Sequence, residues 1–126
     1  MIRVFVFLLA AIVLTMPAAA QRLTPEAVAK QNQAIALRVQ QQLMACWAVP
    51  PGEENQRLAL DIVFFGDGRL EGEAALAPET AKLASKRVLL TQSIMDAVRR
   101  CVPFEGLQAL GARPDERFSV TIVFQS

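Results

Sequence analysis

The amino-acid sequence predicts an α+β domain whose elements follow the order α-β-β-α-β. Two long segments carry apolar residues at helical spacing, and three shorter segments alternate apolar and polar residues as strands do. If the third strand lies beside the first, the two pair antiparallel without a crossover connection. We therefore expect a three-stranded antiparallel sheet in the order 2-1-3, with the two helices covering its one apolar face.

The first helix is predicted from Glu26 to about Cys46. Thr24 and Pro25 supply the cap and the first-turn proline that are typical of a helix N-terminus. The turn signal at 50–52 ends the helix. The apolar residues that recur at helical spacing and should form the buried stripe are Val28, Ile35, Val39, Leu43, Cys46 and Trp47.

A β-hairpin is predicted after this helix. Residues 58–65 alternate strongly and form the most hydrophobic strand, which should therefore be central. Gly66-Asp67-Gly68 is a hairpin turn signal, and residues 69–76 run back beside the first strand. The third strand is predicted from Phe118 to Phe124, with Phe118, Val120, Ile122 and Phe124 facing inward.

The second helix is predicted to begin at Pro78 and to end before Pro103. Arg99 and Arg100 suit the negative end of its dipole. Residues 105–116 contain two glycines and a proline, so we expect a loop there. The apolar stripe of this helix comprises Leu83, Leu90, Ile94, Ala97, Val98 and Cys101.

Residues 1–20 are typical of a secretory signal peptide. Arg3 precedes an apolar run over residues 4–16, and Ala18 and Ala20 suit a cleavage site before Gln21. The alternative is an uncleaved anchor, but spanning a bilayer takes about 20 apolar residues, and Pro17 interrupts this run. We expect cleavage, which leaves 126 − 20 = 106 residues of soluble, exported chain without a membrane span.

Composition excludes several classes of function. The chain has no histidine, which excludes imidazole base catalysis and His-ligated zinc. Beyond residue 20 it carries 13 − 1 = 12 basic and 12 acidic residues, so we expect no nucleic-acid partner. No motif indicates a cofactor or a metal site, and no serine has a candidate base.

Export determines whether the two cysteines are expected to be oxidised. In an oxidising compartment Cys46 and Cys101 are expected to form a disulfide. The bridge would close a loop of about 55 residues, which the chain-entropy model values at roughly 4 kcal/mol. A catalytic redox pair is the alternative, but the spacing is not C-x-x-C and no histidine is present to lower a thiol pKa.

Paired acidic residues are the main candidates for catalysis. They occur at 53–54, at Glu71 with Glu73, and at 115–116. A carboxylate hydrolase needs two acids that face one cleft. Because Glu71 and Glu73 share one face of a predicted strand and the others lie in turns, we interpret them as solvated surface. The protein is therefore not expected to be an enzyme.

The free edge of the sheet is the stronger candidate site. Glu71 and Glu73 on the second strand discourage unwanted pairing. The third strand carries uncharged residues on its outward face, and its backbone could accept a partner strand. Alternatively, this edge is short and twisted or is covered by the loop over residues 105–116. The candidate partner-binding edge comprises Phe118, Ser119, Thr121 and Val123.

Two motifs then indicate a family. The first helix ends in C-W-x-x-P at residues 46–50, and the second ends in R-R-C-V-P-F at residues 99–104. With the hairpin and the last strand, residues 33–126 resemble the C-terminal domain of TolA, in the TolA/TonB C-terminal superfamily. Carried over by position, the residues with structural roles are Cys46, Trp47, Pro50, Arg100, Cys101, Pro103 and Phe104.

The resemblance implies a periplasmic, non-enzymatic protein-interaction domain of the Tol-Pal system, which supports outer-membrane integrity. Such domains contact envelope proteins such as TolB or Pal-type components and accept partner strands at the sheet edge. Only a short N-terminal extension, residues 21–32, precedes the similar region, so we expect a stand-alone, monomeric version. A secreted inhibitor or a small envelope hydrolase using surface carboxylates is the alternative.

Overall fold

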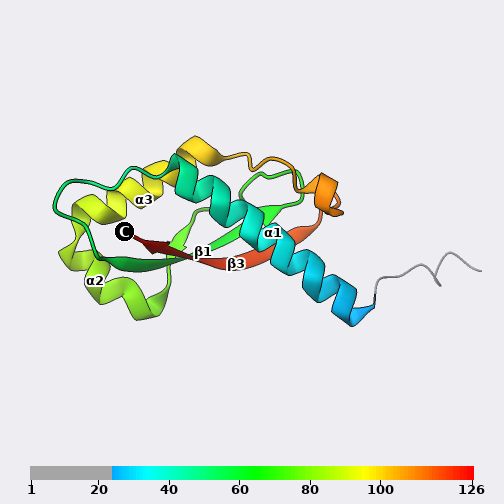
Figure 1. Ribbon diagram of the computed structural model, residues 1–126, viewed down its shortest axis with the longest axis horizontal. Helices are drawn as coiled ribbons and strands as arrows, with labels where there is room; N and C mark the ends of the chain where they lie inside the picture. Colours follow the sequence, from blue (N-terminus) through cyan, green and yellow to red (C-terminus); the bar gives the residue numbers. More distant parts are fainter. Residues whose placement is uncertain (1–23) are drawn as a thin grey trace, which may run out of the picture.

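The computed structural model describes residues 24–126, and it confirms the predicted fold class and strand order. A three-stranded antiparallel sheet in the order β2-β1-β3 carries α1 and α3 on one face (Figure 1). The predicted signal peptide lies outside the described residues. The elements are α1 (Pro25–Cys46), β1 (Arg57–Phe65), β2 (Ala75–Leu76), η2 (Pro78–Thr80), α2 (Ala81–Lys86), α3 (Val88–Cys101), η3 (Gln108–Leu110) and β3 (Arg117–Gln125).

Helix α1 begins where the sequence predicts. The Thr24 hydroxyl accepts a hydrogen bond from the backbone N–H of Ala27 at 3.2 Å, which caps the first turn. Ile35, Val39 and Leu43 are fully buried against the sheet. The expectation that Val28 belongs to this stripe is wrong, because the first turns of α1 project beyond the sheet and leave Val28 40% exposed (Figure 1).

Strands β1 and β3 pair along their whole length and build the core. Their register runs from Arg57 opposite Gln125 to Phe65 opposite Arg117. Alternate side chains of both strands point to the helices, as the period of two predicts. The strand residues that form the buried layer are Leu58, Leu60, Ile62, Phe64, Phe118, Ile122 and Phe124.

The second strand is much shorter than predicted. Only Ala75 and Leu76 form β2, and Leu70 makes a single bridge to Phe64. Between the bridge and the pair of Asp61 with Ala75, β1 spans 64 − 61 = 3 residues while its partner spans 75 − 70 = 5. The two extra residues bulge outward at Gly72, whose φ of +69° favours glycine.

The predicted second helix is divided. The 3-10 turn η2 and the short helix α2 precede α3, and the break lies at Arg87, whose ψ of 65° is not helical. The Thr91 hydroxyl donates to the carbonyls of Arg87 and Ala84, at 2.9 and 3.3 Å. Both carbonyls also accept backbone bonds, Arg87 O from Thr91 N at 3.0 Å and Ala84 O from Arg87 N at 3.2 Å, so the hydroxyl ties the two sides of the break together.

The predicted disulfide is present. Cys46 and Cys101 are bonded, with their Cα atoms 6.0 Å apart, and the bridge joins the last residue of α1 to the last residue of α3. The described residues contain no free cysteine. No helix between residues 24 and 126 combines the length and the hydropathy that crossing a membrane requires.

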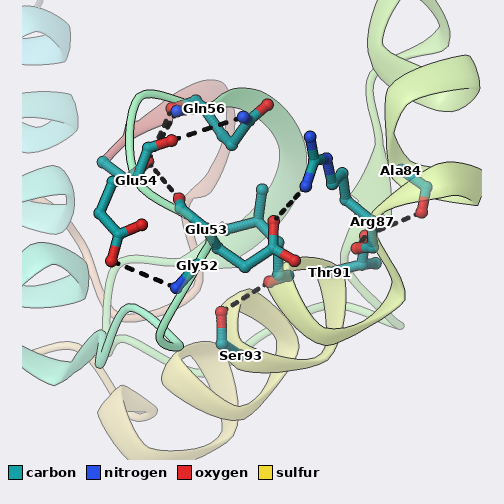
Figure 2. Close-up of polar contacts among 10 residues, drawn as sticks. Gly52, Glu53, Glu54, Gln56, Ala84, Arg87, Thr91 and Ser93 are labelled. Carbon is teal, nitrogen blue, oxygen red and sulfur yellow. Dashed lines mark hydrogen bonds and ion pairs between the residues drawn. The ribbon is translucent and has the colours of Figure 1, made fainter.

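An ion pair between a buried carboxylate and a partly exposed arginine, Glu53 and Arg87, links the loop after α1 to the break between α2 and α3. Figure 2 shows the Glu53 carboxylate facing the Arg87 guanidinium, with a separation of 3.5 Å. Glu53 is only 9% exposed, and its backbone carbonyl also accepts a hydrogen bond from the Ser126 hydroxyl. The loop, the helix break and the end of β3 therefore meet at Glu53.

We expect Arg87→Ala to lower the free energy of unfolding by about 1–3 kcal/mol, because it leaves a buried carboxylate without its partner. Arg99→Ala is the matched control, since its ion pair with Asp96 is largely exposed and should contribute less than about 0.5 kcal/mol. Urea unfolding monitored by Trp47 fluorescence measures both. Adding Glu53→Gln to Arg87→Ala should recover stability, and equal losses in the two arginine variants would contradict the prediction.

Candidate functional site

Within residues 24–126 the outer edge of β3 has no partner strand. The bonds from Gly66 N to Glu116 O and from Ser126 N to Gln56 O, at 2.8 and 2.9 Å, extend the pairing of β1 with β3 at both ends. Both bonds join even-numbered residues. Because hydrogen-bonded and non-bonded residue pairs alternate along an antiparallel ladder, the even-numbered residues of β3 are the ones whose backbone groups bond to β1. The odd-numbered residues of 117–125 therefore direct their backbone groups away from the sheet.

We call the backbone N–H and C=O groups of Ser119, Thr121 and Val123, with those of the flanking Arg117 and Gln125, the β3 free edge. Within residues 24–126 no turn, loop or other element forms a backbone hydrogen bond to these groups. Ser119 and Thr121 are exposed, and Val123 is half-buried. A partner strand can reach all three positions.

Phe118 does not belong to this edge, although it was among the residues predicted for it. Its side chain is 7% exposed and stacks on Phe64, with ring centroids 5.6 Å apart. Its even-numbered position directs its backbone toward β1. Phe118 therefore supports the edge from the core, and the other three predicted residues line it.

Polar contacts fix the side chains beside the edge. The Thr121 hydroxyl donates to a carboxylate oxygen of Asp61 at 2.5 Å across the open face of the sheet. Arg117, the only charged residue of β3, forms an ion pair with Glu71. Glu71 comes from the opposite side of β1, so this pair spans the sheet. The middle of β3 is left without charge.

The loop that could have covered the edge packs elsewhere. Phe104 N donates to Gly68 O at 2.9 Å, and Asp67 N donates to Pro114 O at 3.2 Å, so the loop lies against the hairpin turn. The Gln42 side chain binds both the carbonyl and the N–H of Glu105, at 2.6 and 2.9 Å. These contacts hold both ends of the 105–116 loop against α1 and the hairpin turn, and within residues 24–126 no hydrogen bond joins the loop to the β3 free edge.

The motif residues hold the ends of the two long helices. Trp47 follows α1, donates its indole N–H to the Ser93 hydroxyl at 3.0 Å, and meets Phe124 edge-on with ring centroids 5.2 Å apart. Phe104 is buried and lies edge-on to Phe64. Pro50 is half-buried, whereas Arg100 and Pro103 are exposed and line a shallow cavity beside the disulfide.

One cavity is lined by two carboxylates. Asp67 and Glu105 line one cavity of about 250 Å³ beside the hairpin turn. The backbone N–H and then the guanidinium of Arg69 bind the Asp67 carboxylate and lower its pKa below the usual value. A general acid needs a raised pKa. Within residues 24–126 no three His, Cys, Asp or Glu side chains are grouped as metal ligands would be.

One feature was missed by sequence reasoning. A groove of about 280 Å³ lies between the bulge at Gly72 and α3, with an apolar floor that includes Leu70, Met95 and Val98. Among the described residues, Glu73 is the carboxylate that lines it. An isolated glycine within a predicted strand is a known signal of a bulge, and Gly72 was that signal.

The fold and its edge define a class: a small disulfide-bonded α+β domain with an unpaired strand at one side of its sheet. A family model described as "Uncharacterised conserved protein UCP034077" matches residues 28–125, and the chain belongs to this family. The match covers nearly all of the described residues. No curated protein and no solved structure gives a match.

Proposed function

We propose that the protein is a periplasmic, non-enzymatic protein-interaction module of the cell envelope. It acts as TolA-like domains do, in support of Tol-Pal-linked outer-membrane integrity, and binds an envelope protein such as TolB or a Pal-type component by strand addition. The observation that carries this proposal is the β3 free edge, whose central residues Ser119, Thr121 and Val123 have unpaired backbone groups.

Strand addition uses the chemistry that this edge offers. Three residues present three N–H donors and three C=O acceptors, and each hydrogen bond to a partner strand contributes about 0.5–1.5 kcal/mol net. The neighbouring side chains are short or β-branched and uncharged, so they do not repel an approaching strand. The disulfide between Cys46 and Cys101 suits the oxidising compartment that the proposal requires.

We expect Thr121→Pro to abolish partner capture while most of the core stays folded. Proline removes the central N–H donor of the β3 free edge and places its ring where a partner strand would pair. Ser119→Ala is the control, because it changes an exposed side chain and keeps both backbone groups. The measurement is periplasmic crosslinking from a photo-reactive residue at position 123, followed by identification of the captured protein.

Circular dichroism and the intact disulfide report whether each variant is folded. If folded Thr121→Pro still captures its partner at full yield, strand addition at β3 is wrong. If the captured protein is a secreted hydrolase and not an envelope component, the inhibitor interpretation replaces the TolA-like one.

A further inference from the structure

Strand β3 is close to symmetric about Thr121. Three of the four residue pairs counted outward from Thr121 are alike, namely Val120 with Ile122, Phe118 with Phe124, and the long polar residues Arg117 and Gln125. In the remaining pair, the small polar Ser119 corresponds to the aliphatic Val123.

We propose that a second copy of this chain docks on the β3 free edge. The two β3 strands pair antiparallel about a two-fold axis at Thr121 and join two sheets into one of six strands. In this arrangement residue 119 of one copy lies opposite residue 123 of the other, and residue 117 lies opposite 125. A two-fold axis demands a self-complementary surface, and in this register no residue of β3 faces a like charge.

The hydrogen-bonding phase permits this pairing. The odd-numbered residues of β3 direct their backbone groups outward, and the axis at Thr121 sets odd-numbered residues of one copy against odd-numbered residues of the other. Each unpaired N–H therefore meets an unpaired C=O. A slip of one residue would set outward-facing groups against inward-facing ones and would place side chains on the wrong face.

The side chains also fit this register. On the open face two Thr121 residues meet on the axis, and Thr–Thr neighbours across strands are favourable. On the helix side aromatic Phe118 lies opposite Phe124, so apolar residues continue from one core to the other. Arg117 lies opposite the neutral Gln125, and like charges do not face each other anywhere along the strand.

The central residues of β3 include none of the features that usually prevent edge strands from pairing. Exposed edge strands are usually protected by lysine, proline or inward-pointing charge. Residues 118–124 contain none of these, and the one charge of β3, Arg117, is engaged by Glu71. This inference departs from the monomer that the sequence led us to expect. It implies that an envelope partner must displace the second copy before it can bind.

Sedimentation equilibrium of the exported, oxidised protein tests the dimer. The average mass should rise from one to two chain masses with concentration. Thr121→Lys places two like charges on the axis and should raise the dissociation constant at least about tenfold. Gln92→Lys adds the same charge on the exposed face of α3 and should leave the constant unchanged. A constant mass at all concentrations, or equal effects of both lysines, overturns the proposal.

Cysteine crosslinking tests the register with variants that need not weaken the dimer. Cα atoms in a hydrogen-bonded antiparallel pair lie about 5.5 Å apart, within disulfide range. Thr121→Cys should crosslink to itself, whereas Ser119→Cys should crosslink only when mixed with Val123→Cys. Self-crosslinking of Ser119→Cys to the same extent would show another register. These assays use purified protein alone, so loss of the dimer and failure of partner capture are separate outcomes.

Discussion

Replacing Gly68 by alanine should lower the free energy of unfolding by about 3 kcal/mol or more. A Cβ atom at this position would lie 2.6 Å from the backbone nitrogen of Phe104 and closer still to its carbonyl oxygen. Both are backbone atoms of a segment that is held by the bond from Phe104 N to Gly68 O. The chain therefore cannot relieve the overlap by turning a side chain.

Gly52→Ala is the control for this prediction. Gly52 and Gly68 have similar positive φ angles, +86° and +92°, but nothing lies within 4 Å of a Cβ at Gly52. Gly52→Ala should therefore lower the free energy of unfolding only by the cost of a left-handed backbone at a non-glycine residue, about 1–2 kcal/mol. The difference in urea midpoint between the two variants measures the contact with Phe104. Equal midpoints would mean that the segment after α3 is not packed on the turn as the structure has it.

The elements that the sequence predicted well are those with a local signal. The alternation of β1 and β3 depends only on which face each side chain occupies, and both strands end within one residue of the predicted ends. The cap at Thr24 and the last residue of α1, Cys46, are local in the same way. Chain direction then determined the strand order, because only one placement of the third strand was antiparallel.

The elements that differ depend on contacts between distant residues. The break at Arg87 coincides with its ion pair to Glu53, which lies more than thirty residues earlier in the chain. The bulge at Gly72 shortens β2, and its extent follows from where Leu70 and Ala75 meet β1. The ion pair has no period or motif in the sequence, and Gly72 signals the position of the bulge but not how far it shortens β2.

The sequence predicted the side-chain directions of the candidate edge but not its backbone pairing. Alternation placed Ser119, Thr121 and Val123 outward, but it could not tell which backbone groups remain unpaired. That depends on the phase of the bonds between β1 and β3, and the phase excludes Phe118. The hydrogen bond from Thr121 to Asp61 likewise required the register, since it joins residues sixty positions apart.

Removing the disulfide should have an effect of similar size to the Gly68 substitution. The bridge spans a sequence separation of 55, and freeing the unfolded chain from that loop is worth roughly 4 kcal/mol in the chain-entropy model. Typical domains are stable by about 5–15 kcal/mol, so a large share of the total would be lost. The variant is Cys46→Ala with Cys101→Ala, compared with the oxidised protein by urea unfolding.

Reducing the wild-type chain distinguishes the effect of the disulfide bond on stability from the effect of packing by the two cysteine side chains. If the link is what matters, dithiothreitol should bring the wild type close to the double variant and should not change the double variant itself. Trp47 reports the transition well, because it is the single tryptophan, adjoins Cys46 and contacts Phe124 of β3. If reduction left the urea midpoint unchanged, the joined ends of α1 and α3 would have to be held by their packing alone. In that case the oxidising compartment would no longer be needed to keep the domain folded.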